Sequence, residues 1–335
     1  MTGEGKVKKS VFFVGTGFSK AIDPAYPTLK ELAEQVMIEF DSESLMTHYN
    51  KEVPPSVKKD IGQLLTYLSM DLPWKKDYQK ELDKALFKSI THNIQQYFLK
   101  PPRSVYKNKK LSDYICGNLA PVLTLNYDLV MEAILYSSFP ESERKRYVSY
   151  RSFYKVPMAG LQSLFPLGAR RHSSLYEEEK KPFPPVLKLH GSVNWLWDGE
   201  TYSSAVYCRP IAQLADYEEK VIEHGLSPYI VPPVLDKNSF YTNRILKTLW
   251  QQAYHCIESA KEIFIIGFSF PDTDISVKLL FQSALTFNKN VKIYVVNSDT
   301  SADFIIKYKS IFGNRLLDFT YCCEDAVAKF IQEKI

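Results

Sequence analysis

The chain has 335 residues, of which 45% are hydrophobic and 24% charged, a composition typical of globular proteins with a sizeable apolar core. A net charge of +4 over this length is too small to predict nucleic-acid binding. The apolar run at Val11 is too short for a signal peptide, and no stretch approaches the roughly 18 apolar residues of a membrane span. We therefore expect a cytoplasmic protein that neither binds a membrane nor directly binds nucleic acid.

Five short apolar runs, each ending in small or polar residues, predict strands that are buried on both faces of a parallel sheet. They begin at Val11, Pro121, Pro185, Glu262 and Val291. Helical patterns follow three of them, at residues 29–40 after a capping Thr28, at 129–135 and at 276–287. This alternation predicts an α/β fold with a Rossmann-like, doubly wound and mainly parallel sheet.

Residues 41–118 interrupt the alternation and predict a helical insertion lobe between the first and second strands. Apolar residues recur every four positions from Leu82 to Phe98, which indicates a long amphipathic helix, and residues 61–68 indicate a shorter one. Residues 140–184 are polar and rich in charge and proline, so we expect a surface excursion there. The whole chain, 1–335, is interpreted as a single domain that carries these two additions.

Glycine or polar residues follow each predicted strand, at the edge where open α/β sheets bind ligands. In chain order they are Gly15, Gly17 and Ser19, then Asn126 and Asp128, then His190, then Gly267 and Ser269, then Asn297 and Asp299. Glycines let the backbone approach a pyrophosphate, and a histidine can remove a proton near neutral pH. Each motif alone also fits a plain turn, a helix cap or a structural histidine. Together they predict one crevice.

The five cysteines include no C-x-x-C pair, which argues against a disulfide framework and against a four-cysteine zinc site. We therefore expect reduced thiols and neither a zinc module nor any other metal site.

In order and spacing, the motifs resemble the NAD site of the sirtuin fold. The matching stretches are G-x-G-x-S after the first strand, T-x-N-Y-D at 124–128, L-H-G-S at 189–192, and then G-F-S and V-N. The chain is more similar still to the sirtuin-like domains of bacterial antiphage systems, through I-V-P-P-V-L from Ile230, Leu249–Trp250, and I-I-G-F-S-F-P-D-T-D from Ile265. That group hydrolyses NAD, so the resemblance implies an NADase that releases nicotinamide and ADP-ribose during abortive infection.

The resemblance implies a catalytic set of Asn126, His190 and Asp128. The residues that it implies for the cofactor are Gly15, Gly17, Phe18, Ser19, Gly267, Ser269 and Asn297. Lys20 replaces the third glycine of the dinucleotide fingerprint, and the zinc module of protein deacylases is absent. A catalytically silent scaffold or sensor that binds NAD or ADP-ribose remains an alternative, as does an NAD-dependent protein deacylase. The resemblance further implies a homo-oligomer and a separate controlling partner, such as an ATPase of the same defence system.

Overall fold

The computed structural model describes residues 9–27, 31–32, 43–99, 108–146, 150–160, 182–197, 205–209, 226–235, 237, 240–271, 274–313 and 315–335. A six-stranded sheet lies at the centre, in the order β10-β9-β8-β1-β2-β4, and every neighbouring pair is parallel. Its strands are β1 (Ser10–Val14), β2 (Val122–Thr124), β4 (Val186–Lys188), β8 (Glu262–Ile266), β9 (Lys292–Asn297) and β10 (Leu316–Cys322). The five predicted strands are confirmed, and β10 is an addition at the edge of the sheet.

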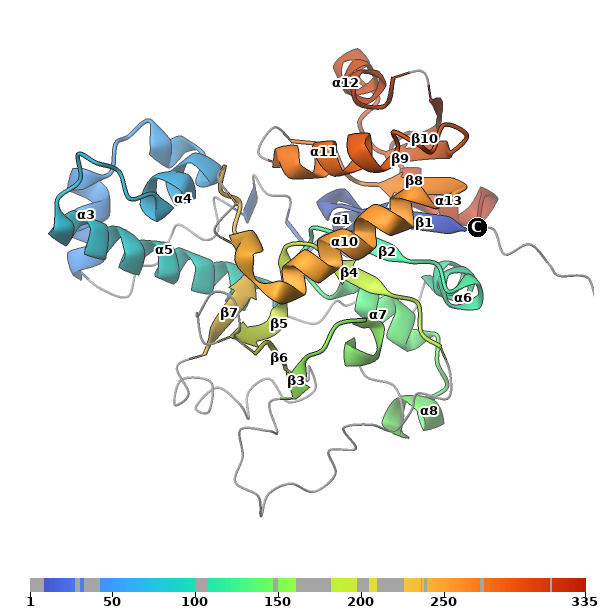
Figure 1. The fold of residues 1–335 in the computed structure, drawn as a ribbon, viewed down its shortest axis with the longest axis horizontal. Coiled ribbons are helices and arrows are strands. Elements are labelled where there is room, and N and C mark those ends of the chain that lie inside the picture. Colours follow the sequence, from blue (N-terminus) through green and yellow to red (C-terminus); the bar gives the residue numbers. More distant parts are fainter. Residues whose placement is uncertain are drawn as a thin grey trace, which may run out of the picture.

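Alternate side chains of β1 enter two apolar clusters, one on each face of the sheet. Phe12 and Val14 belong to one cluster, and Val11 and Phe13 belong to the other. The first face is covered by α1 (Thr16–Ile22), α6 (Lys109–Asn118), α7 (Val130–Ser137) and α13 (Ala326–Glu333). The second is covered by α10 (Arg244–Glu258), α11 (Ile275–Ala284) and α12 (Ala302–Phe312) (Figure 1). The fold is therefore the doubly wound α/β architecture expected from the sequence.

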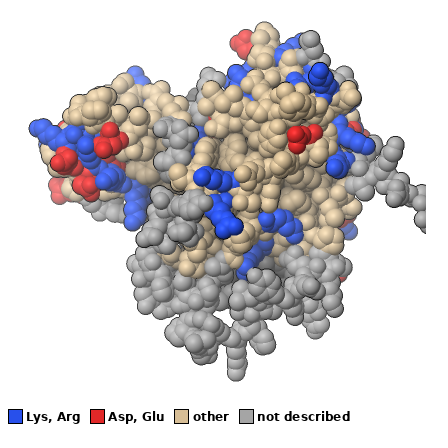
Figure 2. Space-filling model, in the orientation of Figure 1, with Lys and Arg blue, Asp and Glu red and all other residues tan. Residues whose placement is uncertain are grey.

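A group of helices projects to the left of the sheet in Figure 1, and its segments lie between β1 and β2 in the chain. They are α3 (Glu43–Glu52), η1 (Val57–Lys59), α4 (Ile61–Ser69) and α5 (Asp77–Phe98). The Asp83 carboxylate is buried inside this group, 2.8 Å from His48 Nε2 and 2.7 Å from Lys75 Nζ. Charges of both signs mix on its surface, for example in the Lys80–Asp71 ion pair (Figure 2).

A second, four-stranded sheet is joined to the first where β4 leads directly into β5. Its order is β3-β6-β5-β7, from β3 (Ala159–Gly160), β6 (Tyr207–Cys208), β5 (Gly191–Trp197) and β7 (Ser227–Ile230). The turn at Leu189 and His190 joins the two sheets, and Gln95 Nε2 of α5 donates to the Val193 carbonyl of β5 at 2.8 Å. The helical group is thus tied to the polypeptide that carries His190.

The remaining elements are α8 (Glu141–Arg146), η3 (Tyr150–Phe153) and η8 (Phe240–Thr242). Of the surface excursion expected at 140–184, residues 147–149 and 161–181 lie outside the described residues, as does the helix expected at 29–40 except for residues 31–32. No helix in the described part of the chain is both long enough and apolar enough to cross a membrane.

Candidate functional site

The register of the main sheet brings the predicted site residues to one edge. Five strand residues lie side by side at this level, namely Lys188, Thr124, Val14, Ile266 and Val296. Gly15, Gly267 and Asn297 each come one residue later on their strands, and Asn126 and His190 each come two residues later. The backbone therefore places motifs from five distant segments along the carboxyl ends of the strands, as expected for a ligand site in this class of fold.

The glycine turn after β1 packs tightly against the turn after β8. The Gly15 amide donates to the Ile266 carbonyl at 2.8 Å, and the Gly17 amide donates to the Gly267 carbonyl at 3.0 Å. A Cβ on Gly15 would lie 2.5 Å from the Gly267 carbonyl oxygen, and one on Gly267 would lie 2.2 Å from the Phe18 amide nitrogen. Gly267 also has a φ of 63°, which favours glycine. Gly15 and Gly267 therefore allow close contact between the ends of β1 and β8. The Gly15 and Gly17 amides both donate to carbonyls within the chain.

Asn126, Asp128 and Ser19 form one buried hydrogen-bonded cluster. Asn126 Nδ2 donates to Ser19 Oγ at 3.0 Å, and Ser19 Oγ donates to Asp128 Oδ2 at 2.8 Å. The other carboxylate oxygen of Asp128 accepts from the Val130 amide at 3.0 Å, at the start of α7. Asp128 thus stabilises the turn that leads into α7 and also links two predicted motifs. The exposed fractions are only 2% for Ser19, 6% for Asn126 and 5% for Asp128.

Beneath this cluster lies a charge pair that the sequence analysis did not identify. Lys188 of β4 donates through its ammonium to the backbone carbonyl of Asp128, and its Nζ is 3.2 Å from Glu132 Oε1. Both side chains are 1% exposed. The Tyr154 hydroxyl donates to the same Glu132 oxygen at 2.9 Å, and burial is the main cause that raises the pKa of this tyrosine. In the sequence, the signal for this pair was a single charged residue inside each of two apolar runs, Lys188 in PVLKLHG and Glu132 in LVMEAIL.

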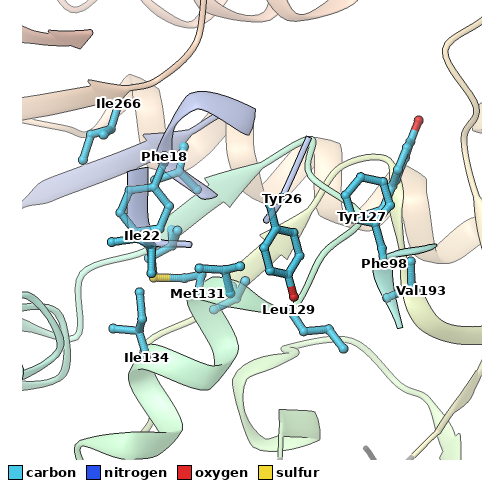
Figure 3. Close-up of a cluster of buried hydrophobic side chains, with 14 of the residues drawn as sticks. Phe18, Ile22, Tyr26, Phe98, Tyr127, Leu129, Met131, Ile134, Val193 and Ile266 are labelled. Atoms are coloured by element: carbon cyan, nitrogen blue, oxygen red, sulfur yellow. The ribbon is translucent and has the colours of Figure 1, made fainter. Parts of the chain in front are cut away.

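These groups surround a small hollow with about 180 Å³ of empty volume. The described residues that line it are Val14, Phe18, Ser19, Thr124, Asn126, Asp128, Met131, Glu132 and Lys188. Phe18 of α1 and Met131 of α7 belong to its apolar lining, and Figure 3 shows both within the buried apolar cluster. This space is divided among narrow gaps between the side chains, none of which has room for a water molecule.

His190 lies in a separate aromatic environment. Its Nε2 is 3.2 Å from the Tyr241 hydroxyl, and its ring centroid is 6.3 Å from that of Trp250. Burial lowers the pKa of His190 to about 4, while the Asp274 carboxylate acts in the opposite direction. Among the hydrogen bonds of the described residues, none joins His190 to Asn126 or to Asp128.

The remaining predicted residues lie nearer to β8 and β9. Ser269 is exposed, and Asn297 Nδ2 donates to the Phe268 carbonyl at 3.3 Å. Phe18 is only 1% exposed and belongs to the apolar cluster under α1, although it also lines the hollow. Within the described ranges, no group of three or more His, Cys, Asp or Glu side chains could hold a metal ion.

Comparisons with known proteins identify the family. The sequence matches the family described as SIR2-like domain over residues 121–310. A solved Sir2 homolog–NAD complex is similar with 13% identity and a TM-score of 0.44, over 96% of this chain and 88% of that one. A Sir2–p53 peptide–NAD+ structure has 12% identity and a TM-score of 0.43, over 97% of this chain and 92% of that one. None of the curated proteins compared matches. Since residues 121–310 are more than half of its length, the chain belongs to the SIR2-like family.

Proposed function

We propose that this protein is an NAD+ glycohydrolase, which cleaves the nicotinamide–ribose bond to give nicotinamide and ADP-ribose. The observation that carries the proposal is the buried Ser19–Asn126–Asp128 cluster at the carboxyl edge of the sheet. Membership of the SIR2-like family supports NAD as the substrate. The polar cluster and the apolar Phe18 and Met131 side chains match the chemistry of nicotinamide, a polar aromatic ring, and would have to move apart to admit it.

The bond to be broken joins C1′ of ribose to a positively charged pyridinium, which is already a good leaving group. As it breaks, its electron pair passes to the ring nitrogen, and C1′ gains oxocarbenium character. Positioning and charge placement therefore matter more than a strong nucleophile. In our proposal Asn126 orients the ribose or the attacking water, and Asp128 faces the carboxamide. Water then adds to C1′.

His190 is the proposed base in this scheme. A pKa of about 4 leaves its imidazole unprotonated at neutral pH, so it can accept the proton of the water or of a ribose hydroxyl. Its side chain contacts Tyr241 in this structure, so it acts beside the hollow rather than within it. For the remainder of the dinucleotide we propose the edge formed by Gly15, Gly17 and Gly267, together with the polar side chains of Ser269 and Asn297.

Replacement of the proposed catalytic pair tests this function. Asn126→Ala and His190→Ala should each reduce the rate of nicotinamide release from NAD+ by at least about a hundredfold, the usual scale for losing a positioned acid–base group. Chromatography of the products gives both the rate and their identity. His255→Ala is the matched control, because the His255 side chain is 73% exposed on α10. Unchanged rates in folded Asn126→Ala and His190→Ala proteins would refute the assignment.

A second candidate is a sensor or scaffold that binds NAD or ADP-ribose without turnover. The placement of His190 favours it, because among the described residues its side chain is hydrogen-bonded to Tyr241 and not to Asn126 or Asp128. Tight NAD+ binding with no nicotinamide release, with or without a partner protein, would support this candidate. A protein deacylase, the third candidate, would release nicotinamide faster when an acyl-lysine peptide is added.

For the biological setting, we propose antiphage defence in the cytoplasm, where NAD hydrolysis would deprive an infected cell of its cofactor. The support is the resemblance of the stretch from Ile230 through Asp274 to sirtuin-like defence domains. Unregulated NAD loss would kill the host, so we propose control through a homo-oligomer or through a separate partner, such as an ATPase.

A further inference from the structure

The ring of His190 is in contact with the hydroxyl group of Tyr241. Among the hydrogen bonds between described residues, this is the one that involves the ring, and it joins Nε2 to the hydroxyl oxygen at 3.2 Å. The backbone of the turn is held as well, because the Val231 amide donates to the His190 carbonyl at 2.8 Å. Trp250 Nε1 donates to the carbonyl of the preceding residue, Leu189, at 3.0 Å. Tyr241 is therefore the hydrogen-bonding partner that determines the state of the His190 ring.

Tyr241 is held in place by two helices on the second face of the sheet. It lies in η8, just before α10, and its ring centroid is 5.1 Å from that of Trp250 on α10, with the ring planes at 64°. Its hydroxyl also forms a hydrogen bond with the Ser276 side chain of α11. The phenol oxygen thus lies between Ser276 and His190, while packing against Trp250 fixes the ring.

The chemistry of the two side chains sets the direction of the bond between them. Burial lowers the pKa of His190 to about 4, so the ring is neutral near pH 7 and has one N–H and one nitrogen lone pair. Burial also raises the pKa of Tyr241, so its hydroxyl keeps its proton. A phenol hydroxyl is a better donor than a neutral imidazole N–H, and an imidazole lone pair is a better acceptor than a phenol oxygen. The hydroxyl therefore donates to Nε2, and the ring proton is on Nδ1.

We propose that Tyr241 restrains His190 in the resting protein, because its hydroxyl donates a hydrogen bond to Nε2. Nε2 then has no free lone pair, and Nδ1 has none because it carries the ring proton. Neither nitrogen can accept a proton until the Tyr241 hydroxyl is displaced by a ribose hydroxyl or a water that donates to Nε2 in its place. This control rests on the proposed function, in which His190 is the base, and it makes Tyr241 a positioning residue that acts through His190.

Nitrogen NMR of the native protein tests this contact without any turnover. In protein that contains isotope-labelled histidine, the His190 ring should have its proton on Nδ1 and a non-protonated Nε2 at neutral pH. The spectrum of His190→Gln identifies the His190 signals. A proton on Nε2 would overturn the proposal, because Tyr241 would then accept the hydrogen bond and leave the Nδ1 lone pair free.

The variant Tyr241→Phe removes the hydroxyl and keeps the aromatic ring. The lost hydrogen bond stabilises the neutral form of His190, so the pKa of His190 should rise by roughly half a pH unit to one unit. Asp274 and Lys237, the charged groups that face the ring and form an ion pair at 2.7 Å, are the same in both proteins. Tyr78→Phe is the matched control, since Tyr78 is 54% exposed on α5. A His190 pKa that stays the same or falls in Tyr241→Phe would contradict the proposal.

The activity of the same variant separates a restraint on the base from a merely structural role. Tyr241→Phe should release nicotinamide from NAD+ roughly two- to tenfold faster than the native protein, the factor that corresponds to one hydrogen bond. A structural role predicts a slower rate, so an unchanged or slower rate in an active enzyme would overturn the restraint. If neither protein releases nicotinamide, the glycohydrolase is contradicted, and the NMR measurements alone decide whether Tyr241 donates to His190.

Discussion

At the scale of single residues, the burial of His190 couples its protonation to the stability of the fold. Its pKa is about 4 in the folded chain, against 6.5 for a free imidazole, because the ring is removed from water beside Tyr241 and Trp250. Between these two values the unfolded chain binds a proton that the folded chain does not. The contribution of the neutral ring to stability is therefore complete above about pH 6.5 and is lost as the pH falls towards 4.

This coupling predicts how stability depends on pH. The free energy of unfolding should fall by up to about 3 kcal/mol between pH 7 and pH 4 because of His190 alone. Other groups titrate in this window, so the measurement is a difference between the native protein and His190→Gln, both unfolded with urea across the range. The native protein should lose more stability than the variant. Parallel curves for the two proteins would show that His190 titrates normally.

The sequence identified some single residues of the site and missed others, for a physical reason. Asn126 and Asp128 follow a buried strand, where a polar side chain stands out against an apolar run. Lys188 and Glu132 lie inside such runs, and nothing in the linear sequence shows that β4 and α7 bring them within 3.2 Å. Each of these two charged side chains is buried beside a partner that lies 56 positions away in the sequence. Only the tertiary structure shows this pairing.

At the scale of elements, the contact between the turns after β1 and β8 holds the edge of the site together. Gly267 combines a φ of 63° with a Cβ position only 2.2 Å from the Phe18 amide nitrogen. Gly313 has nearly the same φ, 62°, but a Cβ there would meet no atom within 4 Å. The two glycines share a positive φ and differ in the space around the position of a Cβ.

The comparison of Gly267→Ala with Gly313→Ala separates these two effects. Gly313→Ala should lower the free energy of unfolding by about 1–3 kcal/mol, the cost of a sparsely populated backbone conformation, since Gly313 has a φ of 62° and a ψ of −135°. Gly267→Ala should cost roughly 1–3 kcal/mol more, because the new methyl group forces the β1 and β8 turns apart. Urea unfolding of both variants gives the difference, and equal losses would show that the turns accommodate the methyl group.

Strand prediction succeeded for nearly continuous apolar runs and missed the other strands, including the buried β5, in which Ser192 and Asn194 interrupt the apolar residues. The runs at β1, β2, β4, β8 and β9 are nearly continuous in apolar residues. In contrast, β10 lies at the sheet edge and includes Asp318 and Thr320, and three strands of the second sheet have only two to four residues. Edge strands and very short strands have no periodicity long enough to recognise.

At the scale of the whole molecule, the proposed control of activity predicts an assembly. The native chain should sediment as a homo-oligomer, or should gain NADase activity only with a partner protein present. Analytical ultracentrifugation and an activity assay over the same concentration range test this together. A monodisperse monomer with full activity at every concentration would contradict the proposed control. It would leave the assignments of Asn126 and His190 in place.

The order of the sheet has a consequence for synthesis of the chain. The strand β1 pairs with β8 on one side, and the Ser10–Glu262 register means that this partner is translated about 250 residues later. At about 5–20 residues per second, that interval is roughly 12 to 50 seconds. During this interval, the apolar segment from Val11 to Val14 of the nascent polypeptide has one backbone edge without a hydrogen-bonding partner. Ribosome-associated chaperones that bind apolar segments would therefore shield this strand until its partner emerges.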